Sequence, residues 1–198
     1  MRKATIIVWL TLLLGAIAAL FWRTDWIYSL PTPVPPRYVA VDFGNGIKLP
    51  AQFNPRNNKP VFLHFFNPRC PCSKFNIPHF KSLVKEYGDK VDFTIVVMSD
   101  REYSEKDIQA KFNLQIAVVF DTAIAKACGV YSTPQAVLLT PGLQLYYRGN
   151  YNRTRYCTDK NSEYAKKAID ALLAHTTNIQ FDRHALIAYG CQVPKCTK

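Results

Sequence analysis

A strand, a turn and a helix around two cysteines limit most strongly how this chain can fold. The apolar run Val61–Phe66 predicts a short buried strand. The run ends at an Asn-Pro pair, and a helical pattern then continues to about Tyr87. Cys70 and Cys72, separated by Pro71, stand where the strand turns into the helix. Proline suits this place, because its missing N–H has no partner to lose in the first helical turn.

The start of a helix is a position that favours a reactive thiol. The first N–H groups of a helix are unpaired, and the helix dipole favours negative charge there. The thiolate is the nucleophilic form of cysteine, and a helix N-terminus lowers the thiol pKa. We therefore expect the sulfur of Cys70 to be ionised and accessible, with Cys72 as its neighbour. The alternative for either cysteine is a buried structural thiol.

Composition indicates one globular domain with appended segments. The 198 residues are 48% hydrophobic and 13% aromatic, which is enough for a core. The 25 Lys and Arg outnumber the 14 Asp and Glu, so the net charge is +11. The basic residues are scattered and no nucleic-acid-binding motif accompanies them, so we expect no nucleic-acid partner. A solvated basic surface is the simplest interpretation, and anionic lipid headgroups or acidic client proteins are the alternatives.

An uncharged apolar run over residues 4–22 predicts a membrane anchor, because a spanning helix needs roughly 20 apolar residues. Arg2 and Lys3 precede it, and Trp22, Trp26 and Tyr28 at and beyond its end fit an interfacial aromatic belt. Positive charge before the run predicts a single-pass protein of the inner (cytoplasmic) membrane, with its domain facing the periplasm or the cell exterior. The alternative is a signal peptide cleaved after 16–18, but the apolar run continues past that point.

The chain divides into four predicted segments. Residues 1–30 form a cytoplasmic tip and transmembrane anchor, and the Pro-rich residues 31–37 form a stiff linker. Residues 38–175 form the folded domain. Residues 176–198 form a cysteine-containing tail with weak periodicity.

Strand and helix patterns alternate along the domain. An Asn-Gly pair between strand-like runs predicts an N-terminal hairpin of residues 38–43 and 47–53. The alternation, closed by a second hairpin, predicts an α/β fold with a mixed central sheet flanked by helices. The further predicted elements are buried strands at 91–98 and 116–120, hairpin strands at 136–139 and 143–149, and helices at 104–112, 121–128 and 162–174.

Residues 38–174 resemble the thioredoxin superfamily, and in particular the membrane-anchored bacterial thioredoxin-like proteins related to the TlpA/ResA group. The resemblance rests on the Cys70-Pro71-Cys72 turn, the extra strand–helix unit at 116–128, and Thr133-Pro134 before a strand. It implies a thioredoxin-like fold and a cis-proline at Pro134. It also implies that Thr133 offers backbone groups to an extended client peptide by strand addition. It implies no metal or organic cofactor.

The sequence departs from the family pattern at the second cysteine. The family has Cys-x-x-Cys, whereas here Ser73 occupies the second place and Cys72 is displaced by one. The resemblance implies Cys70 as the nucleophile and Cys72 as the resolving thiol. Residues i and i+2 of a helix do not face each other, so a disulfide between them would need non-helical geometry at the turn. The peroxiredoxin signature is absent, so peroxidase activity is not expected.

The remaining cysteines leave several pairings open. Cys128, at a helix end among small apolar residues, is predicted to be a core thiol. Two of Cys157, Cys191 and Cys196 would form a structural disulfide, either Cys191–Cys196 or Cys157–Cys191. Alternatively, Cys191 is a partner for Cys70, and Gly190-Cys191 resembles a C-terminal Gly-Cys of relatives with the same Cys-Pro-Cys turn.

The leading functional hypothesis is a membrane-tethered thiol–disulfide oxidoreductase that acts on exported proteins. Its partners would be protein thiols and disulfides, and a membrane electron donor. A second hypothesis is a Cu(I)-binding thioredoxin-like chaperone, with Cys70, Cys72 and either His79 or His184 as ligands. A third is a redox-inert thioredoxin-like module that only presents a binding surface.

Overall fold

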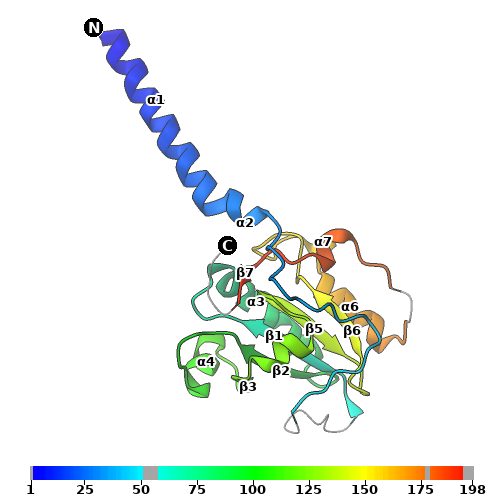
Figure 1. The fold of residues 1–198 in the computed structure, drawn as a ribbon. Coiled ribbons are helices and arrows are strands. Elements are labelled where there is room, and N and C mark those ends of the chain that lie inside the picture. Colours follow the sequence, from blue (N-terminus) through cyan, green and yellow to red (C-terminus); the bar gives the residue numbers. More distant parts are fainter. Residues whose placement is uncertain (1, 51–57, 177–178, 194–198) are drawn as a thin grey trace.

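A long N-terminal helix projects away from a folded domain (Figure 1). The computed structural model describes residues 2–50, 58–176 and 179–193. Helix α1 (Arg2–Phe21) continues through the π-helical turn η1 (Trp22–Trp26) into α2 (Ile27–Ser29). Together they form one helix of 28 residues that is long and apolar enough to cross a membrane, and its apolar window is not buried against the domain. The predicted apolar helix is therefore present.

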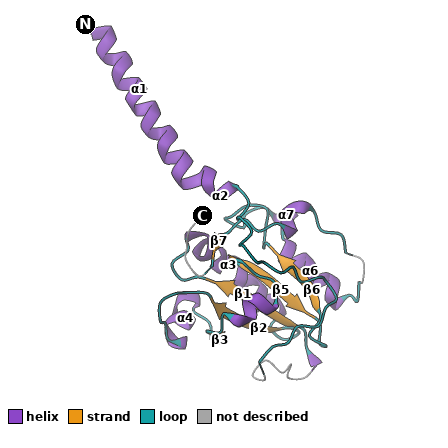
Figure 2. Ribbon diagram, in the orientation of Figure 1, coloured by secondary structure: helices purple, strands orange, loops and turns teal. Residues whose placement is uncertain are grey.

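A five-stranded mixed sheet forms the centre of the domain (Figure 2), in the order β3-β2-β1-β5-β6. Strand β1 pairs in parallel with β2, and β2 with β3, whereas β5 is antiparallel to both β1 and β6. A separate antiparallel pair joins β4 and β7. The strands are β1 (Val61–Phe66), β2 (Asp92–Val97), β3 (Ala117–Val119), β4 (Ser132–Thr133), β5 (Gln135–Leu139), β6 (Leu145–Gly149) and β7 (Cys191–Gln192).

The helices of the domain begin and end where local residue chemistry predicts. Cys70 caps the start of α3, and Gly88 follows its last residue. Ser104 opens α4 with a capping box in which its side chain and that of Asp107 satisfy each other's backbone N–H groups. The helices are α3 (Pro71–Tyr87), α4 (Glu105–Phe112), α5 (Ala123–Ala127), the 3-10 turn η4 (Lys160–Ser162), α6 (Tyr164–Leu173) and α7 (Arg183–Leu186).

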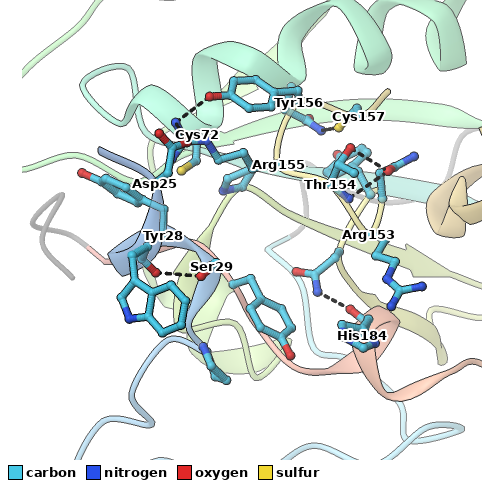
Figure 3. A pocket seen from close by; sticks show the side chains of 18 of the residues that line it. Asp25, Tyr28, Ser29, Cys72, Arg153, Thr154, Arg155, Tyr156, Cys157 and His184 are labelled. Atoms are coloured by element: carbon cyan, nitrogen blue, oxygen red, sulfur yellow. Dashed lines mark hydrogen bonds and ion pairs between the residues drawn. The ribbon is translucent and has the colours of Figure 1, made fainter. Parts of the chain in front are cut away.

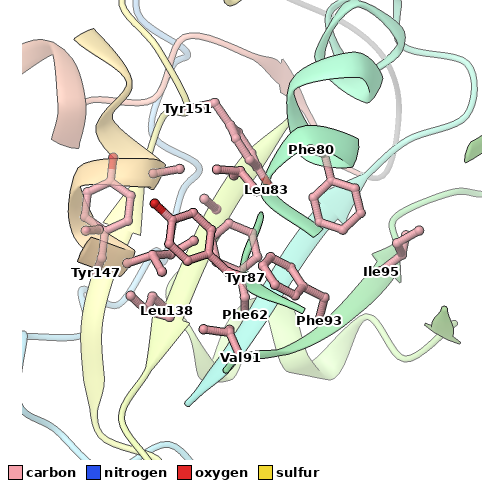
Figure 4. Close-up of a cluster of buried hydrophobic side chains, with 14 of the residues drawn as sticks. Phe62, Phe80, Leu83, Tyr87, Val91, Phe93, Ile95, Leu138, Tyr147 and Tyr151 are labelled. Atoms are coloured by element: carbon pink, nitrogen blue, oxygen red, sulfur yellow. The ribbon is translucent and has the colours of Figure 1, made fainter. Parts of the chain in front are cut away.

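Hydrophobic side chains of β1 are buried on both faces of the sheet. Phe62 and Phe66 pack with α3, α4 and α6 on one face (Figure 4). Leu63 and Phe65 pack with α5 and with Ile47 on the other face. The sequence of a strand that is covered on both faces is apolar at nearly every position, rather than at every second position. The mixed sheet, its helical layers and the helix that begins at Cys70 confirm the predicted thioredoxin-like fold.

The predicted N-terminal hairpin is wrong. Residues 38–43 form no strand, and the chain around the Asn-Gly pair bonds instead to residues 143–145, where the edge strand β6 begins. Gly44 N–H donates to the carbonyl of Leu145 at 2.7 Å, and Ile47 N–H donates to the carbonyl of Leu143 at 2.8 Å. The unpaired backbone groups of an edge strand are available to a neighbouring segment, and here they compete successfully with a local hairpin. Residues 51–53 of the second predicted strand lie outside the described residues.

Strand β3 also differs from the prediction, because it lies at the edge of the sheet and is not buried. Ala117 is exposed, and Phe120, just beyond the strand, is 45% exposed. Apolar content alone does not distinguish an edge strand from a central one. The following helix begins as expected near Asp121, whose Oδ1 accepts a hydrogen bond from Ala123 N–H at 2.8 Å.

Two short elements in the tail are absent from the sequence-based prediction. Helix α7 and strand β7 bring Ala185, Ala188 and Cys191 into the interior, and each of these residues is buried. Elements of two to four residues are too short for a periodic pattern to reveal them. The tail therefore packs on the domain over residues 179–193.

Candidate functional site

The turn between β1 and α3 is held together by Asn67. Cys70 N–H donates to the carbonyl of Asn67 at 3.0 Å, and the Asn67 side chain accepts a hydrogen bond from Arg69 N–H at 2.9 Å. Cys70 itself is extended, with φ −75° and ψ 122°, and the helix begins at Pro71. This is the non-helical geometry that brings Cys70 and Cys72 close despite their spacing of two residues.

The predicted cis-proline is confirmed and lies beside Cys70. The peptide bond between Thr133 and Pro134 is cis. The sulfur of Cys70 lies 3.8 Å from the carbonyl oxygen of Thr133 and donates to it. Two segments that are distant in the sequence thus meet at one sulfur, as the resemblance implies.

The expected accessibility of Cys70 is wrong. Its exposed fraction is 0%, and those of Cys72 and Cys191 are 2% and 1%. These residues form a small apolar cluster of their own, against which Tyr28 packs. Burial therefore comes from the tail and from the end of the N-terminal helix, and the sulfur does not belong to either large core cluster of the sheet. We call Cys70, Cys72 and Cys191 the thiol cluster.

The three sulfurs of the thiol cluster lie within 4.8 Å of one another. Among the alternatives left open by the sequence, the structure thus places Cys191 beside Cys70. A hydrogen bond with Cys191 lowers the pKa of the Cys72 thiol, but a hydrogen bond with Cys70, together with burial, raises it to about 12. Cys72 therefore keeps its proton at neutral pH and can donate it toward the sulfur of Cys70.

A cavity of about 570 Å³ opens beside Cys72 (Figure 3). Arg155 lies across it and connects the domain to the end of the N-terminal helix. Its guanidinium donates to the carbonyl of Thr24 at 2.7 Å and lies 3.4 Å from a carboxylate oxygen of Asp25. The guanidinium also lies over the ring of Tyr28, 5.2 Å from the ring centroid. The cavity is also lined by Trp26, Pro134, Tyr156, Cys157, His184 and Tyr189.

The other described cysteines lie outside the thiol cluster. Cys128 is a core thiol as predicted, and burial raises its pKa to about 12. The sulfur of Cys157 accepts a hydrogen bond from the Asn76 side chain at 3.1 Å, and burial raises its pKa to about 11. Cys157 and Cys191 are both present as thiols, so the predicted disulfide between them is not formed in this structure. Cys196 lies outside the described residues, and its predicted pairing is therefore untested.

Comparison with known families gives a match over most of the domain. The model of the family described as "Domain of unknown function (DUF6436)" matches residues 42–193. The chain belongs to this DUF6436 family. The matched range extends from the segment paired with β6 to the end of β7, so the Cys70 turn, the cis-proline and Cys191 all lie inside this family's domain. No curated protein matches the sequence.

Several solved structures are similar to this chain at low sequence identity. A hypothetical protein from Sinorhizobium meliloti 1021 is 18% identical with a TM-score of 0.63, over 79% of this chain and 96% of that one. An uncharacterised conserved protein from Geobacillus kaustophilus is 21% identical with a TM-score of 0.51, over 62% of this chain and 72% of that one. A putative thiol:disulfide interchange protein DsbE from Chlorobium tepidum is 14% identical with a TM-score of 0.48, over 55% and 85%.

Sequence reasoning missed two side chains that cover the site, one of them (Arg155) inside the DUF6436 domain and the other (Tyr28) in the helical segment that precedes it. Arg155 stands in a polar loop with no motif around it, and only the folded chain brings it to Cys72 and Tyr28. Tyr28 was expected only as an interfacial aromatic residue. For Cys191, the Gly190-Cys191 pair in the sequence indicated a functional cysteine, but it did not indicate which other cysteine lies beside it. The cysteines that the fold brings together support a redox function.

Proposed function

We propose that this protein is a thiol–disulfide oxidoreductase that acts on exported proteins while α1 tethers it to the membrane. The observation that carries the proposal is the position of Cys70, at the start of α3 and 3.8 Å from the carbonyl before the cis-proline. A helix N-terminus stabilises a thiolate, and the neighbouring cysteines supply a second thiol within reach. With Arg2 and Lys3 on the cytoplasmic side, the domain would face the periplasm or the cell exterior.

The reaction follows from the thiol cluster. The Cys70 thiolate attacks one sulfur of a client disulfide, forming a mixed disulfide and releasing the other client sulfur as a thiolate. A second thiol then attacks the Cys70 sulfur, releasing the client as a dithiol and leaving an intramolecular disulfide. The sequence predicts Cys72 in this second role, and the sulfur of Cys191 also lies within 4.8 Å of that of Cys70. A dithiol donor at the membrane would return the two electrons.

Removal of the Cys70 sulfur tests the proposal. We expect the full-length chain in detergent micelles to catalyse the reduction of insulin disulfides by dithiothreitol. Cys70→Ser should lower the catalysed rate by about 100-fold or more, because the covalent intermediate cannot form. Cys128→Ser is the matched control, since Cys128 is equally buried but lies in the core. Equal rates in the wild type and Cys70→Ser would refute the assignment.

Cu(I) binding is a second candidate, favoured by the grouping of three sulfurs within 4.8 Å. Three thiolates around one ion with metal–sulfur distances of about 2.3 Å are about 4 Å apart, so little movement would be needed. Thiolates are the ligands that Cu(I) prefers. The third ligand differs from the prediction, because among the described residues Cys191 joins the pair, and not His79 or His184.

Anaerobic titration of the reduced full-length chain with Cu(I) tests this second function. The function predicts one ion retained against a chromophoric Cu(I) chelator, and a loss of at least about tenfold in affinity for Cys191→Ser. Cys157→Ser, which removes a thiol outside the cluster, should bind as the wild type does. A chelator that strips all the copper from the wild type at equimolar concentration would exclude a copper function.

A further inference from the structure

The tail occupies the backbone edge at which a client strand would be expected to pair. Strand β7 runs antiparallel to β4, with Cys191 opposite Thr133 and Gln192 opposite Ser132. Val193 N–H extends the pairing by donating to the carbonyl of Tyr131 at 3.4 Å. Recognition of extended peptides by strand addition uses the same backbone groups. A client and β7 therefore cannot occupy this edge together.

The tail is fitted closely to that edge. A Cβ atom at Gly190 would lie 2.2 Å from the carbonyl oxygen of Thr133, so only glycine permits this approach. Thr32 in the Pro-rich segment holds the tail from the other side. Its N–H donates to the carbonyl of Ala188 and its hydroxyl to the carbonyl of Gly190, both at 2.7 Å. The tail thus lies between the domain and the linker, and its closure over Cys70 has specific contacts on both sides.

The register of β7 sets which thiol faces Cys70. The carbonyl of Thr133 accepts from the Cys70 sulfur, and Cys191 is the residue paired with Thr133. Cys191 lies in a two-residue strand that pairs only with the short strand β4, whereas Cys72 is fixed in the first turn of α3. Closing a disulfide requires two sulfurs to approach to about 2.05 Å with their Cβ atoms suitably oriented. A strand that docks from outside meets this requirement more readily than a residue two positions along the same helix start.

We propose that β7 is a tethered competitor of the client strand and that its return delivers Cys191 to release the client from Cys70. This inference rests on the proposed oxidoreductase function and assigns its second thiol. The client displaces β7 and its disulfide is attacked by the Cys70 thiolate, which frees one client thiolate. When β7 returns, the Cys191 thiolate attacks the Cys70 sulfur, the bond to the client breaks, and the second client sulfur leaves as a thiolate. The client gains two electrons, and the protein is left with a Cys70–Cys191 disulfide that an external dithiol reduces.

The two roles of β7 predict opposite effects of a variant that opens it. In Gly190→Val all the cysteines remain, but the added side chain overlaps Thr133. The first step should become faster, because Cys70 is uncovered. The second step should become slower, because Cys191 no longer docks. A purely structural defect would not accelerate one step and retard the other.

A two-step chromogenic reaction measures both effects on the reduced full-length chain in detergent micelles. The probe is dithiobis(nitrobenzoate), from which attack by Cys70 releases one thionitrobenzoate and resolution releases the second. We expect Cys191→Ser to slow the second release by at least about tenfold, since an intramolecular thiol has a high effective concentration. The stalled adduct should be found on Cys70 by peptide mass spectrometry. Cys72→Ser tests the competing assignment of the second thiol. Cys128→Ser, which removes a core thiol outside the thiol cluster, is the matched control and should complete the second release at the wild-type rate.

The outcomes separate this inference from the function on which it rests. If Cys191→Ser completes the second release at the wild-type rate while Cys72→Ser stalls, the assignment of Cys191 is overturned and the oxidoreductase proposal survives. If Cys70→Ser reacts as fast as the wild type in both steps, the oxidoreductase proposal itself fails. Should Gly190→Val slow both steps with native circular dichroism, the competition between β7 and the client is overturned.

Discussion

At the scale of single residues, the domain contains a histidine that burial keeps neutral. His64 lies in β1 among aromatic rings, stacked on Phe80 with 4.4 Å between ring centroids. Its Nδ1 lies 2.6 Å from the hydroxyl of Tyr151, and within the described part of the chain its Nε2 has no hydrogen-bond partner. Burial lowers its pKa from 6.5 to about 3. In mildly acidic solution, His64 therefore binds a proton in the unfolded chain but not in the folded chain.

This histidine predicts a loss of stability on acidification. Because the folded pKa is the lower one, the unfolded state binds more protons between about pH 6.5 and 3, and the free energy of unfolding falls as the pH falls. From pH 7 to 5 the contribution of His64 is a loss of about 2 kcal/mol. In His64→Phe this part of the loss should disappear, as measured by urea unfolding of the full-length chain in detergent.

The control for this prediction is His175→Gln. His175 is exposed, so its replacement should leave the wild-type pH dependence intact. An equal loss of stability from pH 7 to 5 in the wild type and His64→Phe would contradict the assignment to His64.

At the scale of elements, the segment around Tyr38 and Val41, where a hairpin strand was expected, is held to the domain by contacts that surround Gly129. The guanidinium of Arg148, in β6, donates to the carbonyls of Val41 and Cys128 at 2.8 and 3.1 Å. Tyr38 donates its hydroxyl to the carbonyl of Gly129 at 2.9 Å. Gly129 has φ +67°, in the left-handed region. The chain can therefore turn sharply after α5 and still leave room for Arg148.

Substitution of this glycine should loosen the segment. Alanine at Gly129 would place a Cβ atom 2.7 Å from the Arg148 guanidinium and strain a positive φ. We expect Gly129→Ala to lower the free energy of unfolding by about 1–2 kcal/mol, measured by urea titration. Gly142→Ala is the matched control, because its Cβ would meet only the hydroxyl of Thr140 at 3.8 Å. Equal stability of the two variants would show that Gly129 carries no such constraint.

At the scale of the whole molecule, Arg155 links the domain to the end of the N-terminal helix. It bonds to Thr24 and Asp25 and lies over Tyr28, which in turn packs on the thiol cluster. Arg155 therefore contributes both to the orientation of the domain relative to the helix and to the cover over Cys72. Such a partly exposed ion pair contributes only about 1 kcal/mol or less, so the link is readily broken.

Removal of the guanidinium should release the segment that joins helix and domain. In Arg155→Ala we expect amide hydrogen exchange over residues 24–31 to become about fivefold faster, corresponding to about 1 kcal/mol. Exchange in α6, which is remote from the link, should not change. Arg153→Ala removes an exposed arginine of the same loop and should exchange as the wild type does. Unchanged exchange over 24–31 in Arg155→Ala would contradict the linking role.

Local residue patterns were sufficient to predict the strand–turn–helix unit around Cys70. Val61–Phe66 and the helix to Tyr87 appear as expected, because a buried strand and an amphipathic helix each carry their pattern within a few residues. The resemblance to thioredoxins also gave the cis bond before Pro134. The predicted hairpin failed, since the backbone of residues 44–47 pairs with residues 143–145 at the start of β6, which no local pattern identifies.

By itself, then, the sequence determined the fold class, the apolar helix and the position of Cys70 at the start of a helix. Only the tertiary structure decided that Cys70 is covered, that Cys191 and not a histidine completes its surroundings, and that the tail lies on the edge of Thr133. The physical reason is that backbone pairing between distant short strands depends on where the rest of the chain has already packed. Periodicity and propensity, which act over a few neighbouring residues, do not contain that information.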